Sequence, residues 1–204
     1  MLLKDYIPSA KKNLRAFFSG IAFNSSKVRR NDIFFAIKGS NFDGNKFIPT
    51  AIKKGCKIIV TDKKIKRKYS GILIIYTNNV RKLLAEVSFK IYKNLPKNLV
   101  AVTGTNGKSS VSDFFYQILK LNNKKVASIG TLGVKSDGIN FDLSNTTIDP
   151  IQLGRILNNL KVKGVDNVIM EASSHGLEQN RLDGLLFNLG IFTNLSQDHL
   201  DYHK

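Results

Sequence analysis

Short apolar runs alternate with helix-spaced apolar residues through the second half of the chain. The runs have the length of buried strands, and the longer segments place apolar residues three and four positions apart. Buried strands that alternate with crossover helices are typical of a mostly parallel sheet with helices on both faces. This pattern predicts strands at 99–103, 125–129, 165–170 and 189–193 and helices at 108–121 and 150–160, the first helix with Val111, Phe114, Phe115, Ile118 and Leu119 on its inner face.

The first half of the chain has a smaller pattern of the same kind. It predicts strands at 33–37, 57–61 and 71–76 and helices at 47–54 and 79–92, the last helix with Val80, Leu83, Leu84, Val87 and Ile91 on one face. Pro96 breaks that helix before the next strand, so that 94–98 is a plausible linker. We therefore expect an α/β protein with two domains, a small one at 1–96 and a second, mostly parallel one at 97–204.

The formal net charge of +17 raises the question of a nucleic-acid partner. The lysines are scattered along the chain, and the densest run, at 63–68, is typical of a solvated loop between two strands. Aromatic residues do not interleave with it as a base-stacking surface requires. A lysine-rich compositional bias explains the charge more simply, and we expect no nucleic-acid partner.

Apolar segments and the cysteine content bear on the cellular compartment. No apolar run reaches 18 residues, and the N-terminal residues do not have the pattern of a secretory signal. The single cysteine, Cys56, cannot form an internal disulfide, which fits a reducing compartment, and we expect it to be a small buried side chain. A cytoplasmic protein with no membrane partner is predicted.

The segment T-G-T-N-G-K-S-S at 103–110 joins a predicted strand to a predicted helix. Its glycines, Gly104 and Gly107, let the backbone approach a phosphate, and the helix N-terminus favours an anion there. Lys108 can reach terminal phosphates and Ser109 can offer a hydroxyl to Mg²⁺. The spacing departs from a Walker A loop, which needs glycine where this chain has Val102. An ordinary strand–turn–helix corner is the alternative, and the flanking elements favour a phosphate site.

Two more polar clusters follow predicted strands, at 171–175 and 193–203. Ligands of parallel sheets bind beyond the carboxyl ends of the strands, so we expect these clusters and the glycine-rich turn to share one rim. Glu171 is favoured as a Mg²⁺ ligand over an exposed carboxylate. Arg181 is equally consistent with an anion fork and a surface salt bridge. No nucleophile elbow surrounds Ser173, Ser174 and His175, which favours hydrogen bonding over nucleophilic catalysis. The last cluster fits a metal site and a capped turn equally well; its residues are Asp198, His199, Asp201 and His203.

These motifs in this order resemble the Mur ligases, and more narrowly the UDP-N-acetylmuramoyl-tripeptide synthetases of that family. The phosphate loop alone is similar to any Mur ligase or folylpolyglutamate synthetase. The segments E-x-S-S-H-G-L at 171–177 and D-H-L-D-Y-H at 198–203 narrow the match, and N-S-S-K-V at 24–28 begins a segment that resembles the N-terminal uridine-nucleotide domain. The resemblance spans nearly the whole chain.

The resemblance implies roles for particular residues. It assigns Gly104, Thr105, Asn106, Gly107, Lys108, Ser109 and Ser110 to ATP, and Ser109, Glu171 and His199 to magnesium. Lys108, Glu171 and His199 are the implied catalytic residues. Contacts with the UDP part of the acceptor are implied for Phe23, Ser25, Ser40, Asn41 and Phe42, and contacts with its muramoyl-peptide part for Asn145, Thr146, Thr147, Ser173, Gln179 and Arg181.

The implied reaction is ATP-driven amide formation. The terminal carboxylate of UDP-N-acetylmuramoyl-dipeptide becomes an acyl phosphate, which the amino group of diaminopimelate or lysine then attacks. In the family a carbamylated lysine and a C-terminal, amino-acid-binding domain follow the D-H-L-D-Y-H segment, and this sequence of 204 residues has neither. We therefore expect an acceptor domain with a partial ATPase domain, inactive alone. The alternatives are a non-catalytic nucleotide- or UDP-sugar-binding fragment and another Mur-type or folylpolyglutamate-type ligase.

Overall fold

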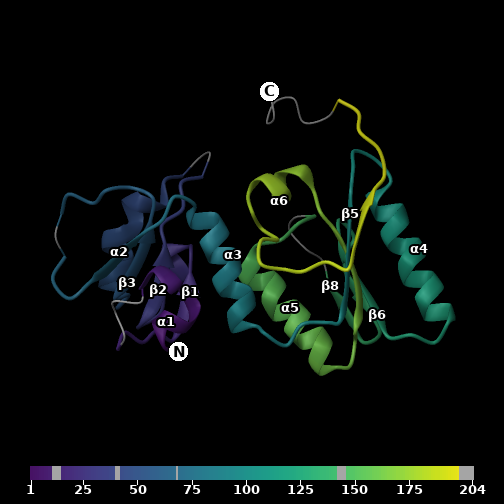
Figure 1. Cartoon of the computed structure of the whole chain (residues 1–204), viewed down its shortest axis with the longest axis horizontal. Helices are drawn as coiled ribbons and strands as arrows, with labels where there is room; N and C mark the ends of the chain where they lie inside the picture. The colour runs from purple at the N-terminus through teal and green to yellow at the C-terminus, as the bar shows by residue number, and fades with distance from the viewer. Residues whose placement is uncertain (11–14, 40–41, 68, 142–145, 198–204) are drawn as a thin grey trace. The chain divides into compact units, whose positions relative to one another are not determined.

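The computed structural model of the chain describes residues 1–10, 15–39, 42–67, 69–141 and 146–197. It divides into two compact units, Met1–Ile91 and Tyr92–Lys204, each with its own sheet (Figure 1). The predicted class, an α/β protein with a small N-terminal unit followed by a mostly parallel second unit, is confirmed. Within the described ranges, no helix is both long and apolar enough to cross a membrane.

The first unit is built on four parallel strands in the order β1-β2-β3-β4. Its strands β2 and β3 are buried at every position, as expected for apolar strands covered on both faces. Every strand and helix predicted here is present, and α1 and β1 are additions that the pattern did not predict. The elements are α1 (Leu3–Tyr6), η1 (Pro8–Ala10), β1 (Gly20–Ala22), η2 (Ser25–Lys27), β2 (Asp32–Phe35), η3 (Gly44–Phe47), α2 (Ile48–Lys53), β3 (Ile58–Thr61), β4 (Leu73–Tyr76) and α3 (Val80–Ile91).

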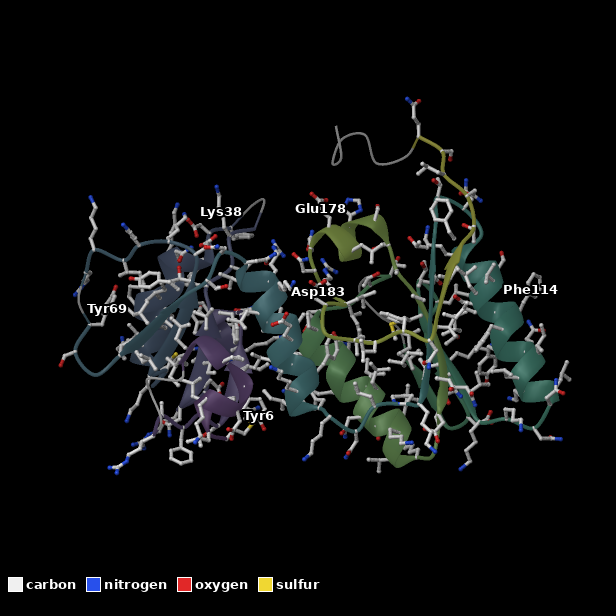
Figure 2. The ribbon with its side chains drawn as sticks, in the orientation of Figure 1. Tyr6, Lys38, Tyr69, Phe114, Glu178 and Asp183 are labelled. Carbon is white, nitrogen blue, oxygen red and sulfur yellow. The ribbon has the colours of Figure 1, made fainter. Side chains whose placement is uncertain are left out.

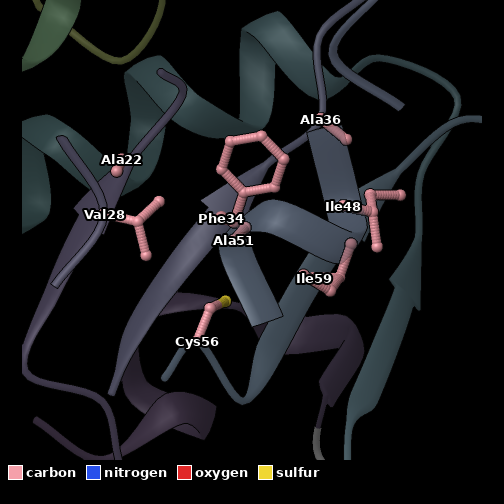
Figure 3. Close-up of a cluster of buried hydrophobic side chains, with 8 residues drawn as sticks. All are labelled: Ala22, Val28, Phe34, Ala36, Ile48, Ala51, Cys56 and Ile59. Atoms are coloured by element: carbon pink, nitrogen blue, oxygen red, sulfur yellow. The ribbon is translucent and has the colours of Figure 1, made fainter. Parts of the chain in front are cut away.

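One core cluster of the first unit lies between the sheet and α2 (Figure 3). Phe34 of β2 and Ile59 of β3 are paired in register, and both pack with Ile48 and Ala51 of α2. Cys56 is buried in the same cluster, as predicted, and burial raises the pKa of its thiol to about 11. On α3, the predicted inner face is confirmed for its central residues, whereas Leu83 and Ile91 are only half-buried.

The second unit has a six-stranded sheet in the order β10-β5-β9-β6-β7-β8. The first four strands are parallel, and β7 and β8 continue the sheet in antiparallel fashion. In Figure 1 the sheet lies between α4 and α5. The elements are β5 (Asn98–Thr103), α4 (Lys108–Leu121), β6 (Val126–Gly130), β7 (Gly133–Ser136), β8 (Ile139–Phe141), α5 (Pro150–Val162), β9 (Asn167–Glu171), α6 (Ser174–Glu178) and β10 (Leu189–Phe192).

The inner face of α4 differs from the prediction. Phe114 and Ile118 are 62% and 58% exposed, and Ser112 and Tyr116 are buried in their place (Figure 2). Tyr116 is covered in part by strand β7, which the pattern did not predict. Its Lys135 places Nζ 4.7 Å from the centroid of the Tyr116 ring and covers that side of the helix. The buried side of α4 faces β6, β9 and β5, with Val111 and Phe115 half-buried against Val102 and Ile169.

Candidate functional site

The turn between β5 and α4 has the backbone of a phosphate-binding loop. Gly104 has φ +134° and Gly107 has φ +86°, values that side-chain-bearing residues rarely adopt. A Cβ on Gly104 would lie 2.1 Å from Oγ1 of Thr193 and 2.9 Å from the carbonyl oxygen of Asn194. Glycine is therefore required here both by conformation and by the close approach of the chain that follows β10.

That following chain holds the turn in place. The backbone N–H groups of Thr105 and Asn106 donate to the carbonyl and side-chain oxygens of Asn194, at 3.1 and 3.0 Å. Thr193 Oγ1 donates to the carbonyl of Asn106 at 2.7 Å, and Ser196 N donates to Thr105 Oγ1 at 3.0 Å. The predicted convergence of these two polar clusters on one rim is confirmed for residues 193–196. Thr193 and Asn194 were not predicted as loop partners, although both lie in the 193–203 cluster.

Helix α4 begins where the turn ends, at Lys108. The N-cap residue Gly107 has no side chain to cap the helix, and the first N–H groups of a helix have no intrahelical partner. Such an end stabilises an anion. Lys108 bends back over the turn, and its Nζ donates to the carbonyls of Gly104 at 2.6 Å and Thr105 at 2.9 Å. Ser109 and Ser110 lie in the same first turn, half-buried and exposed respectively.

Glu171 ends strand β9, beside the strand that leads into the turn, in register with Val102 of β5. It is only 3% exposed, which argues against a simple surface carboxylate. Its Oε1 accepts from Thr131 N at 3.2 Å and its Oε2 from Thr131 Oγ1 at 2.9 Å. A Cβ on Gly130 would lie 2.3 Å from Oε1, so this glycine makes room for the carboxylate. Thr131 was not predicted, although it lies in the G-T-L-G segment at 130–133.

The two threonines at 146 and 147 connect β6 and β9. Thr146 Oγ1 lies 3.0 Å from Thr131 Oγ1. Thr147 is buried, and its Oγ1 donates to the carbonyl of Glu171 at 3.0 Å and accepts from Ser173 N at 2.9 Å. Ser173 also caps α6, because its Oγ accepts from Gly176 N at 3.2 Å. Through these bonds Ser173 is held in the turn that follows β9.

Arg181 belongs to the same network. Its guanidinium donates through Nη1 to the carbonyl of Thr147, and through Nη2 and Nε to Oε1 of Gln179 at 2.8 and 3.3 Å. The guanidinium of Arg181 is held beside Thr147, and its planar set of N–H donors suits recognition of a carboxylate or phosphate.

Seven predicted site residues lie outside the described residues: Ser40, Asn41, Asn145, Asp198, His199, Asp201 and His203. Among the residues that are described, no group of three or more histidine, cysteine, aspartate or glutamate side chains is placed to hold a metal ion. A hydroxyl from Ser109 and a carboxylate from Glu171 are nevertheless the hard oxygen donors that Mg²⁺ prefers, and both lie at the carboxyl end of the same sheet.

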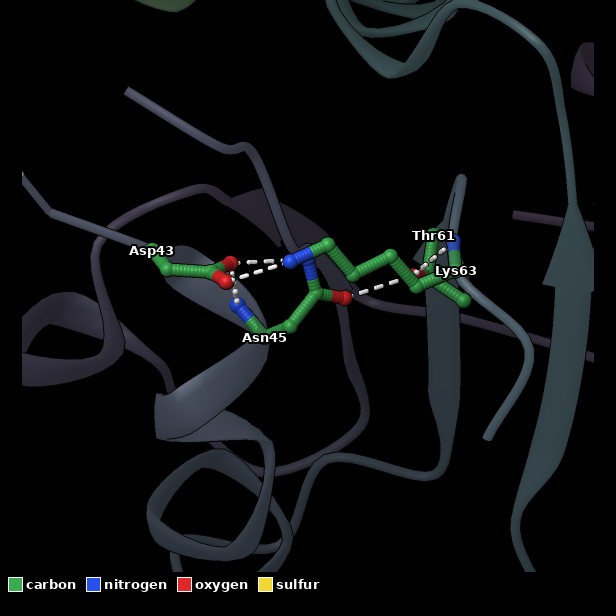
Figure 4. A network of polar contacts seen from close by, with 4 residues as sticks. All are labelled: Asp43, Asn45, Thr61 and Lys63. Carbon is green, nitrogen blue, oxygen red and sulfur yellow. Dashed lines mark hydrogen bonds and ion pairs between the residues drawn. The ribbon is translucent and has the colours of Figure 1, made fainter. Parts of the chain in front are cut away.

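The three described uridine candidates lie in the first unit, beyond the carboxyl ends of β1 and β2. Phe23 directly follows β1 and is exposed, Ser25 begins η2, and Phe42 is exposed after β2. Nearby is a polar network that the sequence did not predict (Figure 4). Asn45 Nδ2 donates to Asp43 Oδ1 at 2.9 Å, and Lys63 Nζ to Asp43 Oδ2 at 2.5 Å.

Acidification is expected to remove the stabilisation that the Asp43 network provides. The hydrogen bond from Lys63, then that from Asn45, lowers the pKa of Asp43 from 3.8 to about 2. Because the folded pKa lies below the unfolded one, this contribution is complete above about pH 4 and is lost as the pH falls toward about 2. Lys63→Gln should therefore lower stability to urea at neutral pH, by less than about 1 kcal/mol for such an exposed pair.

The control for that experiment is Lys64→Gln, which removes a neighbouring exposed lysine. Urea unfolding of the three proteins between pH 7 and about pH 2 is the measurement. The deficit of Lys63→Gln should shrink on acidification, and a deficit that stays constant across this range would contradict the assignment.

Comparisons with known proteins identify relatives over both units. The sequence model of the Mur ligase family catalytic domain matches residues 18–98, and that of the Mur ligase middle domain matches residues 102–204. The chain is 44% identical over 200 residues to the UDP-N-acetylmuramoyl-L-alanyl-D-glutamate–2,6-diaminopimelate ligase of Rickettsia montanensis, covering 94% of this chain and 41% of the relative. It is 40% identical over 197 residues to the ligase of the same name from Clostridium tetani, covering 94% and 40%.

Solved structures agree with this grouping. A structure of a UDP-N-acetylmuramoyl-L-alanyl-D-glutamate–2,6-diaminopimelate ligase superposes with a TM-score of 0.79 at 29% identity, over 94% of this chain and 39% of that one. The MurF ligase of Thermotoga maritima, solved in complex with ADP, gives 0.51 at 25% identity over 76% and 32%. The chain thus spans about two fifths of the length of its curated relatives. On the middle-domain match, which covers half of its length, the chain belongs to the Mur ligase family.

Proposed function

We propose that this chain forms the acceptor- and ATP-binding part of a ligase that adds diaminopimelate to UDP-N-acetylmuramoyl-L-alanyl-D-glutamate in peptidoglycan precursor synthesis. The observation that carries the proposal is the placement of a buried carboxylate, Glu171, on the strand next to the phosphate loop. The amino acid is taken from the names of the curated relatives, and the competing candidate is lysine. The predicted division of labour between 1–96 and 97–204 and the cytoplasmic location are part of the same proposal.

The phosphate loop supports the ATP part of the proposal. Residues 104–110 combine the uncapped start of α4 with a lysine whose ammonium group is held over the turn. Phosphoryl transfer depends mainly on positioning and charge neutralisation, and these groups provide both without a nucleophilic side chain. When bound, ATP supplies the phosphoryl group that activates the acceptor carboxylate. Lys108 must then exchange its two carbonyl partners for phosphate oxygens.

Magnesium is assigned to Ser109 and Glu171, with His199 as a third ligand implied by the family resemblance. Both Glu171 oxygens accept hydrogen bonds from Thr131, which fixes the orientation of the carboxylate. A carboxylate has about four lone-pair sites, so Glu171 retains capacity for a metal ion. Mg²⁺ bound here would neutralise charge on the phosphates.

The threonine and arginine network supports the acceptor part. Thr146, Thr147, Ser173, Gln179 and Arg181 are proposed to hold the muramoyl-peptide, and the contacts among them connect directly to Glu171. An anionic peptide end bound by Arg181 would thus be positioned by residues bonded to the metal-binding strand. Phe23, Ser25 and Phe42 of the first unit are proposed to contact the uridine diphosphate.

Calorimetric titration of the chain with Mg–ATP and with UDP-N-acetylmuramoyl-L-alanyl-D-glutamate tests this function, followed by an assay for ADP release with diaminopimelate or lysine present. We expect one site for each ligand. Binding of both ligands without ADP release would favour the alternative that this chain binds nucleotides without catalysis. That alternative matters because the chain spans two fifths of the length of its relatives. Failure to bind either ligand would overturn the proposal.

A further inference from the structure

The positive charge of this protein is concentrated in one unit. Residues 1–91 contain 20 lysines and arginines against five aspartates and glutamates, a formal charge of +15, whereas residues 92–204 contain 12 against 10, a charge of +2. A compositional bias toward lysine acts on the whole chain and does not produce this asymmetry. The explanation of the charge by composition alone is therefore incomplete.

Two adjoining loops of the first unit carry a dense part of this charge. The first loop contains Arg29 and Arg30 and leads into β2, and the second, at 54–57, leads into β3. Both loops therefore lie at the amino ends of the parallel strands. The loops touch, because Asn31 N donates to Gly55 O at 2.9 Å and Lys54 Nζ to the carbonyl of Ser26 at 2.6 Å. We define as the basic edge the six exposed cations Lys27, Arg29, Arg30, Lys53, Lys54 and Lys57.

Little negative charge offsets the basic edge. Between residues 19 and 61 the acidic residues are Asp32 and Asp43. Asp32 is buried and accepts a hydrogen bond from Arg29 N at 2.9 Å, and Asp43 is paired with Lys63 beyond the opposite, carboxyl ends of the strands. Among residues 19–61, the counter-charge at this end of the strands is the buried Asp32, so six exposed cations create a local positive potential that attracts a polyanion.

An exposed aromatic ring adjoins the same edge. Phe17 is 67% exposed, and two residues later Ser19 N donates to Asn31 O at 2.9 Å, which places this segment beside Arg30. An apolar side chain among cations suits the boundary of an anionic bilayer, where the ring enters the acyl region and the cations contact lipid headgroups. A nucleic acid would instead favour several stacking aromatics or an exposed helix that fits a groove. The helix that reaches the basic edge, α2, is six residues long and packs Ile48 and Ala51 into the core.

From this juxtaposition we propose that the basic edge and Phe17 form a peripheral docking surface for anionic phospholipid membranes. The interaction needs no spanning helix, so it is compatible with the finding that no described helix could cross a bilayer. The prediction of no membrane partner rested on apolar segments and did not consider a surface of this kind. The docking surface lies at the amino ends of the strands, whereas Phe23 and Phe42 follow the carboxyl ends of β1 and β2. Ser25 is next to Ser26, whose carbonyl accepts from Lys54, so this proposed uridine contact borders the basic edge.

Sedimentation of the full chain with vesicles tests the proposal. Vesicles of about 30 mol% phosphatidylglycerol in phosphatidylcholine should retain the protein at low salt, and vesicles of phosphatidylcholine alone should not. Neutralising four of the cations, at about 1 kcal/mol each, should reduce partitioning on the order of 1000-fold. The variant is K27Q/R29Q/K53Q/K57Q, and the control of equal net charge is K64Q/K66Q/K82Q/K124Q, whose exposed lysines lie elsewhere.

Three results decide between the outcomes, with thermal unfolding used to verify that each variant is folded. The proposal is supported if the control variant sediments with anionic vesicles nearly as well as the wild type, the basic-edge variant does not, and Phe17→Ser binds several-fold more weakly. Equal losses for the two fourfold variants would overturn it, because net charge alone would then explain binding. Basic-edge-dependent binding of a 20-nucleotide DNA or RNA oligonucleotide, with no vesicle binding, would overturn it in favour of a nucleic-acid surface.

Discussion

Replacing Lys108 by alanine is expected to weaken Mg–ATP binding on the order of 100-fold, since a hydrogen bond to a charged group contributes about 1.5–3 kcal/mol. The lysine ammonium lies 2.6 and 2.9 Å from two carbonyl oxygens of the loop, so it is already held where phosphate oxygens are proposed to bind. In a complete ligase the same change should abolish ADP release, because charge neutralisation dominates phosphoryl transfer. Isothermal titration calorimetry measures the first effect and a coupled ADP assay the second.

Lys124→Ala is the matched control, because Lys124 is exposed beyond the opposite end of α4. It should bind nucleotide as the wild type does. Unchanged nucleotide affinity in Lys108→Ala, or near-normal turnover of a complete ligase carrying it, would contradict the assignment of the loop.

Gly104→Ala is expected to cost the second unit about 2–5 kcal/mol of stability and to abolish nucleotide binding. The new Cβ would lie 2.1 Å from Thr193 Oγ1, and Thr193 cannot turn away without losing its bonds to the carbonyls of Thr103 and Asn106. The φ of +134° adds strain for any residue with a side chain. Urea unfolding measures the loss of stability.

Gly138→Ala separates strain from steric overlap. Gly138 also has a positive φ, +73°, but a Cβ there would meet nothing within 4 Å. It should cost about 1 kcal/mol and leave nucleotide binding unchanged. Equal effects of the two substitutions would show that close approach of the chain after β10 does not shape the loop.

Regular elements with strong periodicity were predictable from the sequence. The bounds predicted for α4, 108–121, agree with the structure because a glycine-rich turn precedes the helix and apolar spacing runs through it. Strands β7 and β8 were missed because they are short and antiparallel, in a segment without a long apolar run. The buried face predicted for Phe114 and Ile118 was wrong, because helical spacing does not specify which neighbouring elements cover each side of a helix.

The candidate site was predictable in its location more than in its contacts. The rule that ligands bind at the carboxyl ends of parallel strands placed the loop, the Glu171 cluster and the segment after β10 together. The bonds of Thr131 to Glu171 and of Asn194 to the loop join residues 40 and 88 positions apart, and depend on the order of strands in the sheet. The ligand roles of the site residues stay predictions.

Backbone amide chemical shifts test most directly the claim that one unit holds ATP and the other the uridine nucleotide. The spectra of the full chain would be recorded during titration with Mg–ADP and, separately, with UDP. Mg–ADP should shift the amides of 104–110, and UDP should shift those around Phe23, Ser25 and Phe42, each leaving the other set unchanged. Amides of 104–110 that do not respond to Mg–ADP would contradict the account.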